Sequence, residues 1–207
     1  MYLFLYLLTL NPLPMTYNIQ YAENQSRLEL LLRSIFGFIY ILIPHGFVLF
    51  FFGLWSAILS FVSWFSILFT GRYPESFFEF QVNLIRWQAR LNARVFNLAD
   101  GYPAFGIVNT DPVIQVEIPY PTSLSRGLLL VKLFFGWLYV LVPHGFVLFF
   151  LFMGVGIASV IGWFIILFTG SLPRNFHDFI VGYLRWSQRV NNYMTNLTDE
   201  YPPFSLD

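Results

Sequence analysis

Residues 34–71 read SIFGFIYILIPHGFVLFFFGLWSAILSFVSWFSILFTG and contain no lysine, arginine, aspartate or glutamate. Residues 133–173 form a second charge-free run. A helix that crosses a bilayer needs about 20 consecutive apolar residues. Each run is close to twice that length. The two runs therefore predict an all-α membrane protein.

Each run is interrupted near its first third by the same tripeptide, Pro44-His45-Gly46 in one and Pro143-His144-Gly145 in the other. Proline removes a backbone donor and clashes with the preceding turn, and glycine accepts the positive φ of a tight reversal. We therefore expect two transmembrane helical hairpins, over 28–69 and 127–168. The expected helices are Leu28–Ile43, Phe47–Phe69, Gly127–Val142 and Phe146–Phe168.

The alternative is one long kinked helix per run, because proline is tolerated inside membrane helices. The 11 basic residues all flank the runs, and none lies at a Pro-His-Gly tripeptide. A single crossing would put basic clusters on both membrane faces. A hairpin puts them on one face, which the positive-inside rule makes cytoplasmic. Charge placement thus favours hairpins with cytoplasmic termini, although a re-entrant hairpin also fits the short first helices.

Composition points to the same class of protein. The 207 residues are 57% apolar and 11% charged, whereas soluble domains carry about 25% charged residues. This excludes an ordinary soluble enzyme. A net charge of zero offers no electrostatic attraction for nucleic acid. The lack of cysteine excludes disulfides and thiolate metal sites.

The chain also repeats itself. A shift of 99 residues aligns 19–105 with 118–204 without a gap, and 41 of the 87 pairs are identical. We interpret this as a tandem duplication, with repeat 1 at 19–105, a linker at 106–117 and repeat 2 at 118–207. Because a hairpin crosses the membrane an even number of times, the copies should share one orientation, about a pseudo-two-fold axis along the membrane normal.

A third helix is expected after each hairpin, over 75–98 and 174–197. Gly71 and Gly170 suit the C′ position of the preceding helix, and a proline follows three residues later. Apolar and aromatic residues recur along one face of this helix and charged residues along another. We therefore expect an amphipathic helix in the cytoplasmic membrane interface.

Residues 1–18 form an apolar N-terminal extension. Its first ten residues are too short to span a bilayer and lack the basic start of a secretory signal. Residues 1–14 either precede a natural chain start at Met15 or act as a small interfacial anchor.

The pattern W-F-x-I-L-F-T-G-x-x-P, followed by F-x-x-F, R-W-x-x-R and D-x-Y-P-x-F, resembles a widespread bacterial integral-membrane family catalogued as a domain of unknown function. The resemblance covers nearly all of both repeats. Repeat 2 is the better match, because Ala22, Gly101 and Ala104 depart from the pattern in repeat 1. The resemblance implies a location in a bacterial plasma (inner) membrane and an architecture, and it supplies no catalytic residue or cofactor.

Two histidines are the first candidate functional residues. His45 and His144 are strongly polar groups between apolar segments, and imidazole can relay protons or bind an ion. The alternative is that each histidine satisfies backbone carbonyls freed by a turn. No carboxylate lies in either run to complete a metal site, so we expect no metal.

A stripe of arginines on the third helices is the second candidate. Guanidinium groups pair well with phosphate, which predicts binding of anionic lipid headgroups. The alternative is pairing with nearby carboxylates of the same chain. The stripe consists of Arg86, Arg90, Arg94, Arg185 and Arg189.

No hydrolase, metalloprotease or nucleotide-binding motif occurs, so we expect no catalysis and no cofactor. The favoured function is an accessory or scaffolding subunit that packs against lipid, other membrane proteins or itself. The first alternative is a membrane-curvature wedge made of hairpins that do not fully cross. The second is a small channel or transporter that uses the two histidines.

Overall fold

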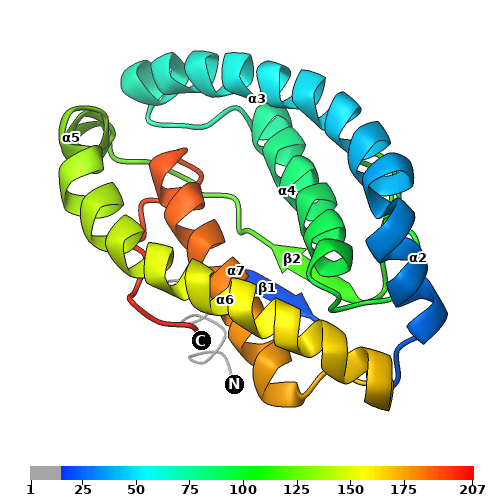
Figure 1. Ribbon diagram of the computed structural model, residues 1–207. Coiled ribbons are helices and arrows are strands. Elements are labelled where there is room, and N and C mark those ends of the chain that lie inside the picture. Colours follow the sequence, from blue (N-terminus) through cyan, green and yellow to red (C-terminus); the bar gives the residue numbers. More distant parts are fainter. Residues whose placement is uncertain (1–14) are drawn as a thin grey trace, which may run out of the picture.

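The structure, a computed structural model, describes residues 15–207. It consists of two similar helical halves joined by a short two-stranded ribbon (Figure 1). The first half contains β1 (Thr16–Ile19), α2 (Arg27–Gly37), the π-helical turn η1 (Phe38–Leu42), α3 (Ile43–Thr70) and α4 (Glu75–Val95). The second contains β2 (Ile114–Glu117), α5 (Arg126–Gly136), the π-helical turn η2 (Trp137–Leu141), α6 (Val142–Thr169) and α7 (Arg174–Met194).

The expected hairpins are wrong, and one long helix per run is the correct alternative. Residues Arg27–Thr70 and Arg126–Thr169 each form a continuous 44-residue helix. Pro44 follows a π-helical turn in which Ile43 N–H bonds to Phe38 O. The wider turn shifts the hydrogen-bond register, so the proline ring and its missing donor bend the helix without ending it. Gly46 keeps a negative φ and makes no reversal.

The flanking arginines explain why charge placement favoured hairpins. Arg27, at the start of α2, donates to the carbonyl of Phe168 at the end of α6, over 3.0 Å. Arg126 donates in the same way to Phe69 at the end of α3, over 2.9 Å. Helix C-termini carry unpaired carbonyls and partial negative charge. The basic residues at the starts of the two long helices therefore cap the end of the opposite long helix.

Each long helix curves around the shorter helix that follows it (Figure 1). Trp87 of α4 bonds to His45 of α3, and Gln81 of α4 bonds to Ser56 of α3. Between these contacts α3 advances by eleven residues and α4 by only six, about 17 Å against 9 Å of helix rise. The long helix thus takes the outer path, with its convex side outward.

The third helices differ from expectation in length and burial. α4 ends at Val95 and α7 at Met194, three residues early, because Asn97 and Asn196 adopt positive φ. The apolar face of α4 is buried by the rest of the molecule, including Phe78 and Trp87. The helix is therefore amphipathic as expected, with its apolar face packed against the protein, and its place in a membrane interface stays a prediction.

The ribbon is a feature that the all-α prediction missed. β1 lies in the expected N-terminal extension and β2 in the expected linker, and the two strands pair antiparallel. α7 packs against β1, and α4 against β2. Each third helix thus packs on a strand from the other half, and the halves are intertwined about a pseudo-two-fold axis. Residues 1–14, and with them the chain-start and anchor hypotheses, lie outside the described part.

Candidate functional site

The two candidate histidines each lie in an aromatic cluster at the bend of a long helix. Trp87 Nε1–H donates to Nδ1 of His45 over 2.8 Å, and Trp186 donates to Nδ1 of His144 over 3.0 Å. Both imidazoles are fully buried. Because the indole nitrogen is only a donor, Nδ1 accepts and a neutral ring carries its proton on Nε2. Each histidine therefore pins α4 or α7 to the bend.

In repeat 2 the cluster continues as a hydrogen-bonded chain. His144 Nε2 lies 3.1 Å from the Tyr201 hydroxyl, which donates to the carbonyl of Tyr139 in η2 over 3.1 Å. The π-helical turn thus presents a carbonyl that a distant tyrosine satisfies. This chain ties the segment after α7 to the bend in the long helix.

In repeat 1 the same residue types are present, but the chain is shorter. Tyr102 stacks on Tyr40 and lies 5.2 Å from His45 between ring centroids. Among residues 15–207, Nε2 of His45 has no hydrogen-bond partner. The two clusters are therefore equivalent in packing and different in their polar connections.

The clusters have the character of structural anchors. Every aromatic contact of His45 and His144 is made within its own repeat, so the two histidines do not pair. Over the described residues, no group of three His, Asp or Glu side chains could hold a metal ion. Each histidine thus bonds to an indole, and not to the backbone carbonyls or the ion that the sequence suggested.

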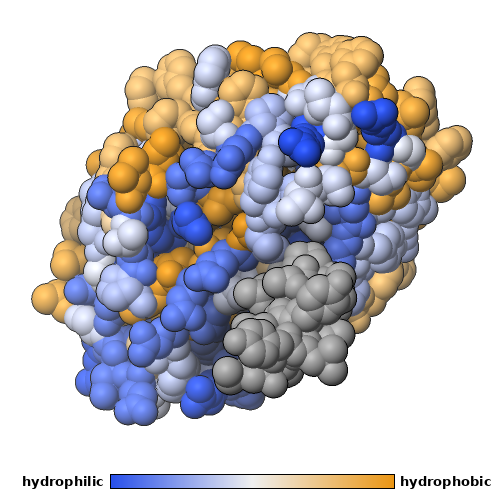
Figure 2. All heavy atoms as spheres, turned by 180° about the vertical axis from the view of Figure 1, so that it is seen from behind, coloured by the Kyte–Doolittle hydropathy of each residue, from blue (hydrophilic) through white to orange (hydrophobic). Residues whose placement is uncertain are grey.

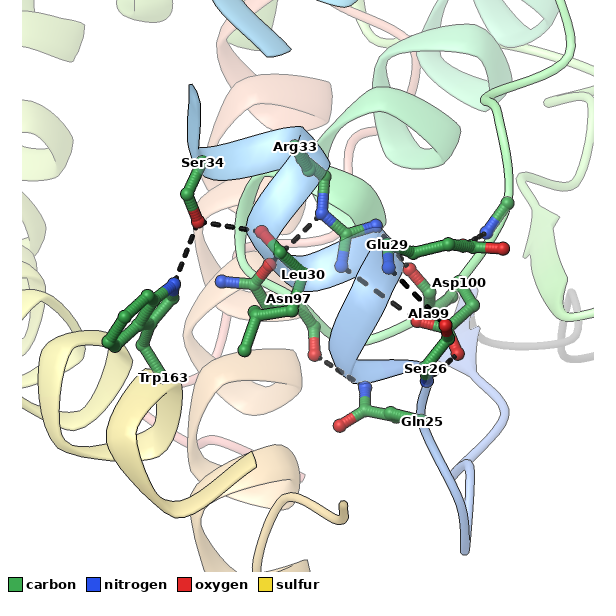
Figure 3. Close-up of polar contacts among 11 residues, drawn as sticks. Gln25, Ser26, Glu29, Leu30, Arg33, Ser34, Asn97, Ala99, Asp100 and Trp163 are labelled. Carbon is green, nitrogen blue, oxygen red and sulfur yellow. Dashed lines mark hydrogen bonds and ion pairs between the residues drawn. The ribbon is translucent and has the colours of Figure 1, made fainter. Parts of the chain in front are cut away.

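A second arrangement occurs in both halves and ties the start of each long helix to the segment after α4 or α7. Figure 3 shows it in the first half. The Asp100 carboxylate accepts from Ser26 N–H over 2.6 Å, and the Arg33 guanidinium donates to the Ala99 carbonyl. In repeat 2, Asp199 accepts from Ser125 N–H, and Lys132 bonds to Asp199 and to the Thr198 carbonyl. A basic side chain and a carboxylate thus hold these segments together in each half, with Lys132 buried and Arg33 half-buried.

Four of the five stripe arginines donate to backbone carbonyls of the chain itself, and Arg90 does so to the carbonyl of Gly106. Arg86 Nε donates to Val116 O over 2.9 Å, and Arg185 Nε donates to Tyr17 O over 2.8 Å. These are reciprocal contacts with the ribbon strand of the other half. Arg189 donates to Ser205 O. Arg86 remains exposed, and Arg185 and Arg189 are half-buried, so these three retain access to a ligand.

Arg90 and Arg94 do not fit the expected lipid-facing stripe. Arg90 is 2% and Arg94 5% exposed, and Arg94 forms an ion pair with Asp111 at 2.7 Å. Burial lowers the pKa of Arg90, with Asp111 opposing that change. Arg94 thus pairs with a carboxylate of the same chain, and Arg90 donates to the carbonyl of Gly106, because a guanidinium inside the fold must be satisfied there.

Sequence reasoning missed the partners of the histidines. Trp87 and Trp186 follow their histidines by the same 42 residues, and the tyrosines at 102 and 201 are also shared by both copies. Identity between the two repeats at polar aromatic positions was the available signal. It could not show contact, because the partners lie on different helices.

Comparison with known families agrees with the duplication. A family model described as "Domain of unknown function (DUF4389)" matches residues 27–106 and 130–205, which fall in the two repeats and cover most of the chain. This confirms the resemblance to a family of unknown function. No curated protein and no solved structure matches the chain.

Proposed function

The chain belongs to the DUF4389 family, a family of domains of unknown function, and from its geometry we propose a non-catalytic membrane protein that shapes the bilayer. In this proposal two long apolar helices are embedded in one leaflet and a polar layer faces the water. The observation that carries it is the row of exposed, large apolar side chains along both long helices.

The exposed apolar surface is far larger than a monomeric soluble protein tolerates. Only 17% of the most apolar window of each long helix is buried. Phe47, Phe50 and Phe61 are 62–66% exposed, and their counterparts on α6 are similar. Exposed apolar surface costs about 25 cal/mol per Å² in water, and patches beyond a few hundred Å² mark contact with lipid or protein. Lipid is the cover that fits a surface extending around most of the helix.

The length of these helices argues for an orientation along the membrane. A 44-residue helix is about 66 Å long, against a hydrocarbon core of about 30 Å. An upright crossing would push about half of an apolar helix into water. A helix lying along the leaflet keeps its whole length in hydrocarbon. Its convex side then faces the lipid, and its concave side packs on the shorter helix.

Charge distribution supports a single polar face. Polar side chains cover the middle and lower part of the face seen in Figure 2, with apolar side chains along its upper and left edges. The capping arginines join the start of each long helix to the end of the other, so these charges lie at the helix ends and not along the apolar surface. By the positive-inside rule the layer faces the cytoplasm of a bacterial plasma membrane, with the pseudo-two-fold axis along the membrane normal.

Such an insertion adds area to one leaflet. Amphipathic insertions that reach only the upper acyl region expand that leaflet and bend the bilayer toward it. Two rigid curved helices in one molecule make this a wide wedge. The function is thus mechanical, and it needs no catalytic group.

Depth labelling tests the orientation, and the absence of native cysteine makes single labels simple. Fluorescent labels on Phe47→Cys and Phe61→Cys should be quenched by lipids that carry a quencher at shallow depth. A label on Glu79→Cys, an exposed position on α4, should be quenched only by aqueous reagent on one side. Access to the label at residue 47 from the opposite side would refute the one-leaflet orientation.

Liposome imaging tests the mechanical function. Reconstitution of the full chain should convert large vesicles into tubules or small vesicles as the protein-to-lipid ratio rises. The matched control is Phe50→Asp, combined with Phe61→Asp, because two carboxylates on the outer face should prevent insertion. Unchanged vesicle size at saturating bound protein would contradict membrane shaping.

The accessory-subunit hypothesis is the second candidate, and open glycines favour it. A Cβ atom built on Gly46, Gly53, Gly145 or Gly156 meets no described atom within 4 Å. Bare backbone on an apolar helix allows another membrane helix to approach closely. Extraction of native membranes under mild conditions tests this: a fixed ratio to another protein supports a subunit, and a particle of this chain alone opposes it.

The complete burial of His45 and His144 within their own clusters speaks against a channel.

A further inference from the structure

A cavity of about 420 Å³ lies between β1, the last turns of α7 and the segment that follows α7. Two arginines and two acidic residues line it, together with two tyrosines. These residues are Tyr17, Arg185, Arg189, Glu200, Tyr201 and Asp207. Its volume is within the range of small-molecule sites.

The charged groups around this cavity are not paired with one another. Among the described residues, neither Arg185 nor Arg189 forms an ion pair, although Glu200 and Asp207 line the same space. The two guanidiniums bond instead to neutral carbonyls, of Tyr17, Leu206 and Ser205. Nε of Arg189 is buried and has no partner among residues 15–207.

The charges around the cavity act on the pKa of Arg189 in both directions. Burial lowers the pKa of Arg189, and Arg185 lowers it further, while Asp207 and Glu200 oppose these effects. Two like charges on one wall and two opposite charges on the same cavity favour a ligand that carries both signs. A purely anionic ligand would meet the carboxylates, and a purely cationic ligand would meet the guanidiniums.

We propose that this cavity binds a zwitterion that combines a phosphodiester with a primary ammonium, the chemistry of a phosphoethanolamine headgroup. The phosphate oxygens accept from the free N–H groups of Arg185 and Arg189, since guanidinium suits bidentate phosphate binding. The ammonium donates to Glu200 and Asp207. Ile118 and Pro202, which also line the cavity, cover the carbon atoms of the ligand.

A lipid is the source that this location favours, and this part of the inference rests on the proposed function. Tyr201 lines the cavity, and its hydroxyl donates to the Tyr139 carbonyl in the bend of the long apolar helix. The cavity is thus connected to the helix that acyl chains would follow. The zwitterion chemistry itself does not depend on how the helices lie in the membrane.

Calorimetric titration of the full chain in detergent tests the chemistry. Glycerophosphoethanolamine should bind at least tenfold more tightly than glycerol 3-phosphate or ethanolamine alone. Glu200→Gln should weaken glycerophosphoethanolamine at least fivefold and leave glycerol 3-phosphate unchanged or tighter. Arg189→Gln should weaken both. The matched control is Arg86→Gln, at the repeat-1 counterpart of Arg185, which should change neither.

Glu200 is a safe position to change, because it is exposed and its carboxylate makes no hydrogen bond among the described residues. Equal binding of the zwitterion and its two halves, or full binding by a folded Glu200→Gln protein, would overturn the proposal. Native mass spectrometry from nanodiscs with equal phosphatidylethanolamine and phosphatidylglycerol separates the two sources. If the protein retains phosphatidylethanolamine and the Glu200→Gln variant loses it, the ligand is a lipid. If the protein shows no lipid preference but binds glycerophosphoethanolamine in the titration, the ligand is a free zwitterion. The depth labels report separately on membrane embedding.

Discussion

Tyr17 and Val116 lie opposite one another in the ribbon, and they are also counterparts under the 99-residue repeat. Two residues that are equivalent under a two-fold axis can lie directly opposite one another only where the axis passes between them. The pseudo-two-fold axis therefore passes between Tyr17 and Val116. The neighbouring pair of Asn18 with Gln115 maps onto the pair of Thr16 with Glu117 in the same way. One strand from each half therefore forms the centre about which both long helices are arranged.

The reciprocal arginine caps should contribute equally to stability. We expect Arg27→Ala and Arg126→Ala each to lower the free energy of unfolding by about 0.5–1 kcal/mol, the usual value of a cation at an exposed helix C-terminus. The double variant should be additive, because the caps are independent. Chemical unfolding in detergent, followed by circular dichroism, measures this. Arg72→Ala is the control, since its exposed side chain makes no bond among residues 15–207. An equal loss in the control would contradict the capping role.

The indole–imidazole bonds should be worth more than exposed aromatic contacts. Trp87→Phe removes the donor to His45 and leaves a buried nitrogen unpaired, at a cost of about 1–3 kcal/mol. Trp55→Phe is the matched control, because Trp55 is 50% exposed and surface changes stay within about 0.5 kcal/mol. Unfolding curves of both variants give the comparison. Equal stability of the two would show that the bond to His45 contributes nothing.

Substitution of two glycines by alanine should have opposite effects on the unfolding temperature. At Gly182 a Cβ atom would lie 2.9 Å from the backbone oxygen of Leu206, which also accepts from Arg185. We expect Gly182→Ala to lower the unfolding temperature and to detach the segment that follows α7. At Gly156 the Cβ atom meets open space, so Gly156→Ala should leave that temperature unchanged or raise it. Proteolysis near residue 204 measures the detachment, and equal rates for both variants would oppose this packing.

Tyr17 gives the protein a dependence on alkaline pH. Burial raises the pKa of this phenol to about 12, whereas an unfolded tyrosine titrates near 10. Between these values the unfolded state loses the proton that the folded state keeps, so stability falls as pH rises. We expect Tyr17→Phe to reduce the slope of unfolding free energy between pH 10 and 12. An unchanged slope would show that Tyr17 titrates normally in the folded chain.

Much of the secondary structure could be read from the sequence. The duplication, the two apolar runs and the glycines that end them at residues 71 and 170 were confirmed, because these depend on local composition and backbone geometry. The Pro-His-Gly tripeptide misled, because its effect depends on the π-helical turn before it. That turn shifts the backbone register by one residue, and no residue type specifies it.

The candidate site was only partly predictable for a different reason. His45 and His144 stood out as polar groups in apolar runs, but their indole partners lie 42 residues away on another helix. The arginine stripe was visible as a helical period. Which members face inward depends on the strand that each third helix meets, and that strand comes from the other half of the chain.

By itself the sequence determined that this protein is a duplicated helical chain with two long, strongly apolar segments, since both properties can be read from residue identity alone. The tertiary structure alone decided that each run is one curved helix, that the halves exchange strands and caps, and that two arginines are buried while others line a cavity. Those outcomes depend on which unpaired carbonyls, donors and charges meet across the pseudo-two-fold axis. Contacts between residues up to 168 positions apart settle them, as between Arg185 and Tyr17.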